Sequence, residues 1–336
     1  MYNLQLKPFD KTPKYKQIVQ SVITDIDRGT LKNGQQLPSI NELSGEYDVA
    51  PDTVEKAYRE LRARGFVLSV HGKGYYVQTA EAHKPRILLI FDELSSYKKA
   101  IYYAFLAALN DQATVHVEIH HFSGPAFQRI IEHNLGKYNY YVVMPHFTQD
   151  LGKADYERVL NTIPANELVL LDKNVPNLKQ NCLRVFQDFD RDIFEALEGM
   201  QDLLVKYERL VLVTPSHGNY PVEIVWGFRT FCINYRKSFA IKSSAVEEAL
   251  QASTAYIVMR ETDLVELVKK LRQTSYLLGR EVGMMTFNDT PLKELLNMTV
   301  MTTDFQAMGR TTAELLLSKQ QLKVRNPFHI IRRGSI

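Results

Sequence analysis

The 336-residue sequence predicts an α/β protein in which parallel sheets follow a small helical domain. Two observations lead to this prediction. Residues 1–77 contain helical patterns and then one hairpin signal, whereas residues 86–336 alternate short apolar segments with helical patterns. Such alternation is typical of doubly wound parallel sheets. A region of this length exceeds one open sheet, so we expect two α/β lobes.

The composition is that of a globular protein. Hydrophobic residues make up 45% of the chain and charged residues 24%, and no apolar run reaches the roughly 18 residues of a membrane span. The N-terminus lacks the apolar core of a signal peptide, and Cys182 and Cys232 have no metal-type spacing. We therefore expect a reduced, cytoplasmic setting.

The first two helices follow from apolar spacing and capping residues. Residues 14–28 should form the first helix, because Gly29 follows a set of apolar residues at helical spacing, namely Ile18, Val19, Val22 and Ile26. Ser39 and Glu42 have the S-x-x-E spacing of a capping box. They predict a short second helix that stops around Tyr47.

The third helix should begin at Pro51, which suits a first helical position, and end at Gly65. Its buried face consists of Val54, Ala57, Tyr58 and Leu61. Two β-rich segments then flank "HGKG", residues 71–74, which is a hairpin signal. Three helices and a two-stranded wing make a winged helix-turn-helix domain over residues 1–77. The polar residues 78–85, "QTAEAHKP", are predicted to link it to the domain at 86–336.

Seven strands are expected in the larger domain, with "RILLIF", "VHVEIHHF", "YYVVMP", "ELVLLD", "RLVLVTP", "AYIVMR" and "VGMMTF" as their sequences. Helices are expected between most of them, for example over residues 98–110, 191–206 and 263–278. In such lobes, ligands bind beyond the carboxyl ends of the strands.

Positive charge is concentrated in the third helix and wing. Residues 53–78 contain five basic and two acidic residues, whereas the whole chain has a net charge of only +3. The local surplus fits contact with nucleic acid, but it also fits a solvated helix face.

Residues 13–77 resemble the GntR family of bacterial transcription regulators. The resemblance rests on "PKYKQI", "GTLKNGQQLPSINELS", "DTVEKAYRELRARGFV" and "HGKGYYV". Residues 86–336 resemble the effector domain of LacI/GalR regulators and periplasmic sugar-binding proteins, through "VGMMTFNDTPLKELLNMTVMTTDFQAMGRTTAELLLSK", "WGFRTFC" and "NPFHIIRRGS". The arrangement is similar to that of arabinose-type repressors, which join a GntR head to a LacI-like body.

The resemblance implies a DNA-binding head in which the third helix enters the major groove and the wing approaches a minor groove. The residues expected to contact DNA are Lys14, Ser39, Asn41, Thr53, Lys56, Arg59, His71, Gly72 and Lys73. Asn41, Pro51 and Glu55 stand where the family often has arginine. Asn41 would suit adenine, and Glu55 could accept from cytosine. Compensation of the helix dipole without any base contact is favoured for Asp52 and Glu55.

The resemblance also implies an effector site between two lobes. The candidates at strand ends are Asp92, Glu93, His146, Asp172, Lys173, Asp188, Tyr220, Glu223, Arg260 and Asn288. Sugar sites combine such polar groups with an aromatic face. Ile224, Arg260 and Asn288 depart from the residues that relatives have there, so we expect a sugar-sized site with different contacts.

The function implied is that of a ligand-responsive transcription regulator, most simply a repressor. It would bind operator DNA as a homodimer and respond to a small sugar such as L-arabinose or L-fucose. The alternatives are a sugar-binding protein or a sugar-acting enzyme without DNA regulation. No nucleophile elbow is present in the sequence, so we expect neither catalysis nor a cofactor. His116, Glu118 and His120 could share one strand face as metal ligands, but a solvated strand is favoured.

Overall fold

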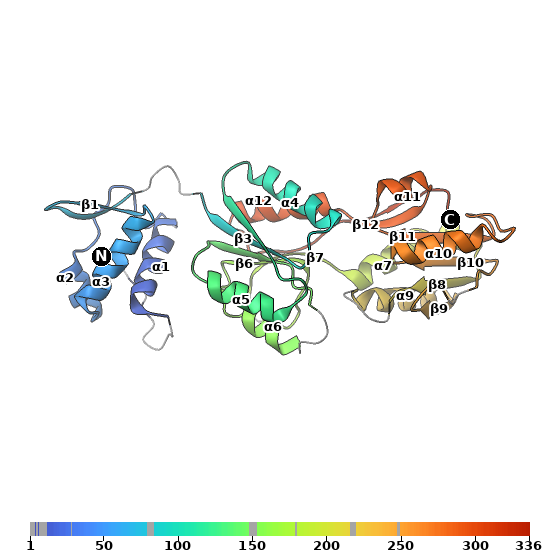
Figure 1. The fold of residues 1–336 in the computed structure, drawn as a ribbon, viewed down its shortest axis with the longest axis horizontal. Coiled ribbons are helices and arrows are strands. Elements are labelled where there is room, and N and C mark those ends of the chain that lie inside the picture. The colour runs from blue at the N-terminus through green and yellow to red at the C-terminus, as the bar shows by residue number, and fades with distance from the viewer. Residues whose placement is uncertain are drawn as a thin grey trace. The chain divides into compact units, whose positions relative to one another are not determined.

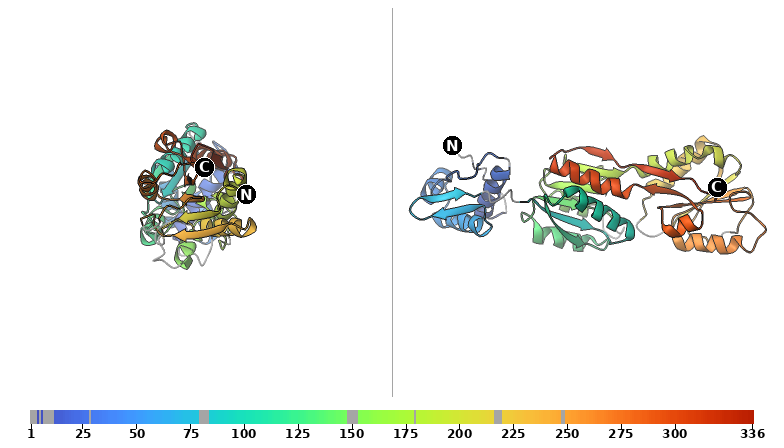
Figure 2. Two further views of the ribbon diagram at one scale, coloured as in Figure 1. Left: turned by 90° about the vertical axis from the view of Figure 1, so that its right-hand side faces the viewer. Right: turned by 90° about the horizontal axis from the view of Figure 1, so that it is seen from above.

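The structure is a computed structural model that describes residues 4, 6, 12–27, 29–78, 84–147, 153–178, 180–215, 220–246 and 249–336. It divides into two compact units, Met1–Lys84 and Pro85–Ile336, which we call the head and the body (Figures 1 and 2). Residues 79–83 of the predicted linker lie outside the described residues.

The described residues of the head form three helices and a hairpin, as expected. The helices are α1 (Lys14–Asp27), α2 (Ile40–Tyr47) and α3 (Pro51–Ala63), and the antiparallel strands are β1 (Val67–Val70) and β2 (Gly74–Val77). Leu43 of α2 and Leu61 of α3 are fully buried in one apolar core with the inner face of α1. The burial of that core holds the three helices together.

Local capping sets the bounds of the helices in the head. Ser39 accepts a 3.2 Å hydrogen bond from the backbone N–H of Glu42, and the Glu42 carboxylate accepts one of 2.7 Å from the N–H of Ser39. The expected capping box is therefore confirmed. At the end of α3, Gly65 has a φ of 78°. Its N–H donates to the carbonyl of Arg62 at 3.0 Å, and the N–H of Phe66 donates to that of Leu61 at 2.9 Å, which is the Schellman arrangement.

The body consists of two lobes, each built on a six-stranded sheet (Figure 1). The lobe 1 sheet is entirely parallel, with strand order β13-β7-β6-β5-β3-β4. Helices α4 and α12 pack on one of its faces, and α5 and α6 on the other. The bounds are β3 (Arg86–Phe91), α4 (Ser96–Leu109), β4 (Thr114–Ile119), α5 (Gly124–Asn134), β5 (Tyr140–Val143), α6 (Lys153–Leu160), β6 (Leu168–Lys173), β7 (Leu183–Gln187), α12 (Phe305–Leu317) and β13 (Lys323–Arg325).

The lobe 2 sheet has strand order β14-β12-β11-β10-β8-β9, and β14 is its one antiparallel strand in the described region. Helices α7, α8 and α9 share one core with this sheet, and α10 packs on the opposite core. The bounds are α7 (Phe189–Glu198), α8 (Gln201–Leu204), β8 (Arg209–Val213), α9 (Glu223–Asn234), β9 (Ser238–Lys242), β10 (Thr254–Val258), α10 (Glu261–Leu271), β11 (Val282–Phe287), α11 (Pro291–Leu295), β12 (Thr299–Thr303) and β14 (Phe328–Ile331).

The predicted fold class is correct, but some elements differ. The helix expected over residues 191–206 is divided into α7 and α8 around Gly199, and the helix expected over 263–278 ends at Leu271. The strands β7, β9, β12 and β13 were not among the seven expected. Strand β9 lies at a sheet edge and is mostly solvent-accessible, so it lacks the continuous apolar run that marked the central strands.

The chain passes between the two sheets at three places. Strand β7 leads into α7, β12 leads into α12, and β13 leads into β14 (Figure 1). Neither lobe is therefore formed by one continuous segment of sequence. These crossings lie at the carboxyl ends of the parallel strands β7 and β12, where the effector candidates were predicted.

Candidate DNA-binding surface and effector site

The structure places the predicted DNA-contacting residues on four parts of the head. Lys14 begins α1, Ser39 caps α2, and Asn41 lies in the first turn of α2. Thr53, Lys56 and Arg59 lie on α3, and His71, Gly72 and Lys73 form the turn between β1 and β2. All nine are exposed except Thr53, which is half-buried, so their side chains remain available to a partner.

Two lysines at the start of α1 and in α3 are held in place by neighbours. The Lys56 ammonium lies 4.1 Å from the centre of the Tyr15 ring, which is a cation–π contact. Lys14 Nζ donates to the carbonyl of Asp48 at 3.3 Å. Asp48 follows α2, so these contacts connect α1 with the turn and with α3. Tyr15 was not among the predicted site residues.

Glu55 is occupied within its own helix. Its carboxylate pairs with Arg59 at 3.2 Å in an i, i+4 arrangement, and both side chains are more than half exposed. Such a pair stabilises a helix by only about 0.3–0.5 kcal/mol. Pro51 stands at the first position of α3, after the N-cap residue Ala50, which has no side-chain cap. The ion pair with Arg59 favours a structural role for Glu55, because its carboxylate already has a partner within the helix and needs no contact with a DNA base.

The wing turn is fixed by backbone geometry. Gly72 and Gly74 have φ values of 72° and 101°, a region that glycine adopts without strain. Gln36 Nε2 donates to the carbonyl of Lys73 at 2.8 Å, and Tyr76 Oη donates to the same carbonyl at 3.2 Å. The Lys73 backbone is therefore anchored while its ammonium is exposed.

In lobe 1, three of the predicted effector residues meet around a lysine that sequence reasoning missed. Lys98 Nζ lies 2.9 Å from Asp172 Oδ2 and 3.4 Å from Asp92 Oδ1. His146 Nε2 lies 2.9 Å from the same Asp172 oxygen. The four side chains, which we call the lobe 1 cluster, are all buried. They come from the carboxyl ends of β3, β5 and β6 and from the first turn of α4.

The charges in this cluster stabilise one another. Burial alone would raise the pKa of Asp172, but Lys98 and His146 outweigh it and hold that pKa well below its usual value. Burial likewise opposes the charge on Lys98, yet Asp172 and Asp92 raise its pKa. Asp172 also has a φ of 73°, a strained conformation for a residue with a side chain. The cluster is thus a fixed arrangement of opposite charges.

In lobe 2, Tyr220 lies close enough to Arg260 of the same lobe and to Glu93 of lobe 1 for their charges to affect it. Arg260 Nε donates to Asp263 at 2.6 Å. Burial raises the pKa of Tyr220, Arg260 opposes this, and the charges of Asp263 and Glu93 add to it. Glu93 follows β3, and a hydrogen bond between Gln187 at the end of β7 and Thr303 at the end of β12 brings the carboxyl ends of the two sheets together.

Tyr97 is an aromatic residue of this region that the sequence analysis did not select. Its ring stacks on Phe305 with centroids 5.1 Å apart. Burial raises its pKa to about 12, and Glu261, Tyr220 and Asp289 of lobe 2 contribute. Tyr97 is half-buried, and its ring is an aromatic surface of the kind that ligand sites use. A second aromatic residue, Tyr156, has a raised pKa because of burial, with contributions from Glu157 and from Glu223 of lobe 2.

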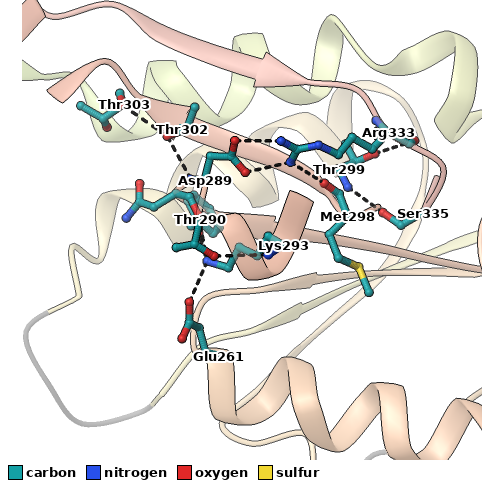
Figure 3. A network of polar contacts seen from close by, with 12 residues as sticks. Glu261, Asp289, Thr290, Lys293, Met298, Thr299, Thr302, Thr303, Arg333 and Ser335 are labelled. Carbon is teal, nitrogen blue, oxygen red and sulfur yellow. Dashed lines mark hydrogen bonds and ion pairs between the residues drawn. The ribbon is translucent and has the colours of Figure 1, made fainter. Parts of the chain in front are cut away.

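The loop that carries Asn288 is held by two basic side chains (Figure 3). Arg333 donates two hydrogen bonds of 2.8 Å to the Asp289 carboxylate. Lys293 Nζ, which is buried, donates to the carbonyls of Phe287 and Asn288 at 2.7 and 2.8 Å. Asn288 itself has a φ of 60°. The loop is thus rigidly positioned, with Asp289 committed to Arg333.

Two further predicted residues, Asp188 and Lys173, are not members of the lobe 1 cluster. Asp188 is half-buried, and burial together with the neighbouring Asp190 carboxyl raises its pKa. It lies beside the first chain crossing. Lys173 ends β6 next to Asp172, is half-buried, and has a partner within the protein. Asp172 itself accepts bonds at both carboxylate oxygens, so it is not an uncommitted partner for a ligand hydroxyl.

The histidines of β4 do not form one exposed face. His116 and Glu118 are exposed, whereas His120 lies beyond the strand, is fully buried, and has Nε2 3.1 Å from the Met144 carbonyl oxygen. Among the described residues, no group of three or more His, Cys, Asp or Glu side chains is arranged to hold a metal ion. None of the helices in the described ranges has the length and hydropathy needed to cross a bilayer.

These features define a winged helix-turn-helix head followed by a two-lobed α/β body of the periplasmic-binding-protein type. Residues 14–77 match the family described as bacterial regulatory proteins, gntR family, so the head is a gntR-family domain. The HTH-type transcriptional repressor YtrA of Bacillus subtilis is 38% identical over 74 residues, which are 22% of this chain and 57% of YtrA. The chain thus spans little more than half of that relative.

The body resembles solved repressor structures in fold. A structure of the lac repressor dimer bound to operator and an anti-inducer has a TM-score of 0.60 and 14% identity, and the match covers 76% of this chain and 95% of that one. The trehalose repressor of Escherichia coli has a TM-score of 0.58 and 14% identity, with coverage of 74% and 100%. At this identity the comparison shows the shared LacI/GalR-type fold.

Proposed function

We propose that the protein is a transcription regulator whose head binds operator DNA and whose body binds a small sugar. The observation that supports this most directly is the combination in one chain of a capped helix-turn-helix with exposed basic residues and a two-lobed body. Residues 78–85 would serve as the linker. Specificity would fall to Asn41, Thr53 and the wing, since Glu55 is paired with Arg59.

The effector would bind where the carboxyl ends of the two sheets face each other. Tyr97 and Tyr220 supply aromatic surface there, and Glu93, Glu223 and Asn288 supply hydrogen-bonding groups. A neutral monosaccharide such as L-arabinose or L-fucose fits this chemistry. Binding can alter DNA affinity only if the sugar prefers one arrangement of the lobes. We infer repression relieved by the sugar, in line with the repressors that the chain resembles.

A homodimer would present two heads to a pseudo-palindromic site. The test is an electrophoretic shift of DNA from upstream of the protein's own gene, with and without a panel of neutral sugars. We expect a sequence-dependent shift at low salt that one of the sugars weakens. Absence of any shift at low salt would exclude the regulator function.

A thermal-shift screen with the same sugars identifies the effector independently of DNA. A ligand that binds only the folded state raises the melting temperature by mass action. DNA binding without a response to any sugar would retain the regulator function and exclude this class of effector.

A further inference from the structure

A side-chain hydrogen bond connects the buried charges of lobe 1 to a strand of lobe 2. Gln187 Nε2 donates to Asp172 Oδ1, and Gln187 Oε1 accepts from Thr303 Oγ1. Gln187 is the last residue of β7, and Thr303 is the last residue of β12, 116 positions later. The side-chain amide of Gln187 therefore bonds to lobe 1 through its nitrogen and to lobe 2 through its oxygen.

The two residues stand where the chain crosses between the lobes. Gln187 immediately precedes the crossing into α7, and Thr303 that into α12. Hydrogen bonds from the backbone and side chain of Asn326 join these crossings to the third one. The N–H of Asn326 donates to the Phe186 carbonyl at 2.7 Å, and Asn326 Nδ2 donates to the Asp304 carbonyl at 3.1 Å. The Gln187 side chain extends this hinge to the lobe 1 cluster.

Because they are buried, the hydrogen bonds from Gln187 to Asp172 and Thr303 are sensitive to a movement of one lobe relative to the other. Asp172 and Thr303 are each 4% exposed, so water has little access to replace a lost bond there. A rotation of one lobe about the crossings must break the bond between Gln187 and Thr303, or else move the Gln187 amide relative to Asp172. The Gln187 amide therefore changes between separate sets of hydrogen bonds rather than shifting gradually. Allosteric coupling requires an element of this kind.

We propose that Gln187 couples effector binding beside the lobe 1 cluster to the relative arrangement of the lobes, with Thr303 as its partner in lobe 2. The proposal rests on the proposed effector site. An effector hydroxyl that bonds to Lys98 or His146 changes the hydrogen bond that this group makes to Asp172. The Gln187 amide responds, and its bond to Thr303 transmits the change to β12. Gln187 and Thr303 thus act as positioning residues and need not touch the effector.

The test compares Thr303→Val, which removes the hydroxyl and keeps the shape, with Thr303→Ser, which keeps the hydroxyl. For each full-length variant, the dissociation constant for the upstream DNA is measured with and without the sugar selected by thermal shift, L-arabinose and L-fucose first. Thr230→Val, at an exposed position of α9, is the matched control.

In the wild type, Thr303→Ser and Thr230→Val, we expect the sugar to change DNA affinity by the same factor. In Thr303→Val that factor should fall at least about fivefold, while the affinity for sugar, measured by calorimetry, changes less than about threefold. If the sugar changes the DNA affinity of Thr303→Val by the same factor as in the wild type, the proposal is wrong. An equal loss in Thr303→Ser, or a Thr303→Val protein that no longer binds the sugar, also overturns it.

Gln187→Met repeats the test from the other partner, should Thr303→Val fail to fold. Because both changes interrupt one path, the double variant should lose no more coupling than either single variant. Additive losses would count against a shared path. A wild-type protein that binds DNA but responds to no sugar refutes the proposed effector site, and with it this coupling.

Discussion

The ammonium of Lys56 in α3 lies over the ring of Tyr15 in α1, 4.1 Å from its centre. The ring restricts where this lysine can point, and so prepares it for a phosphate. We predict that Tyr15→Leu weakens binding to any duplex roughly two- to fivefold, since an exposed cation–π contact contributes about 0.5–1 kcal/mol. Tyr15→Phe keeps the ring and should bind as the wild type does. Equal losses in both variants would assign Tyr15 a role through its hydroxyl instead.

Lys73 at the wing turn should contribute a phosphate contact that does not depend on sequence. Lys73→Ala is expected to weaken binding to all duplexes alike and to reduce the slope of log K against log salt by about 1. Fluorescence anisotropy titrations at several salt concentrations measure this slope. An unchanged slope would remove Lys73 from the phosphate contacts.

Removal of Lys98 should destabilise the body strongly. Lys98→Met leaves Asp92 and Asp172 buried without their cation, which should cost about 3–5 kcal/mol of unfolding free energy. The neighbouring Lys99 is exposed, so Lys99→Met is the control and should change little. Chemical denaturation monitored by circular dichroism gives both values. Adding Asp172→Asn to Lys98→Met should recover part of the loss, because it removes one of the unpaired charges.

The ion pair between Arg333 and Asp289 should make the stability of lobe 2 depend on pH in the acid range. The hydrogen bonds from Arg333 lower the pKa of Asp289, so the folded state favours the ionised carboxylate. This contribution is fully present above the unfolded pKa of about 3.9 and is lost as the pH falls through the lower folded value.

We therefore predict that Arg333→Gln destabilises by about 1–3 kcal/mol at neutral pH, and that the difference from wild type shrinks below about pH 4. Arg332→Gln is the control, because its pair with Asp202 is about half exposed and should contribute about 0–1 kcal/mol. A difference that stays constant down to acid pH would contradict the assignment.

Negatively charged sugars should bind worse than neutral ones. Lys98, Arg260 and Lys293 each pair with a protein carboxylate, while Glu93 and Glu223 add negative charge. In calorimetric titrations, the phosphate ester of the effector sugar should bind at least about tenfold more weakly than the sugar, because it meets uncompensated carboxylates. Tighter binding of the ester would show that a cation is available.

The sequence was sufficient for the head and for most strands in the interior of the sheets, although it missed β7 and β12. The capping box, Pro51 and Gly65 are local signals, and each acts within a few residues of its own position. Most of the strands found from apolar runs are buried on both faces, and β4 is an exception, since it is an edge strand and mostly exposed. Strand β9 was missed because it lies at the edge of its sheet, and β13 because three residues form no recognisable pattern.

The candidate site was only partly predictable. Strand-end acids identified Asp92 and Asp172, but Lys98 pairs with Asp172 across 74 positions, a relation that no local pattern encodes. One signal was present. Lys98 lies in the first turn of α4, where a positive charge opposes the helix dipole, so another interaction had to compensate. Tyr97 and Thr303 had no comparable signal, since each has neighbours in the other lobe.

The interleaving of the two lobes also sets the order in which the body can fold during synthesis. Helix α12 supplies Met308, Ala313 and Leu316 to a core whose other members begin at Ile87. Lobe 1 therefore cannot complete this core until the ribosome has released α12, by which time most of lobe 2 has been made. The nascent chain must keep an unfinished apolar surface out of contact with other chains for much of translation. A truncation before α12 would make that exposure permanent and should yield insoluble protein.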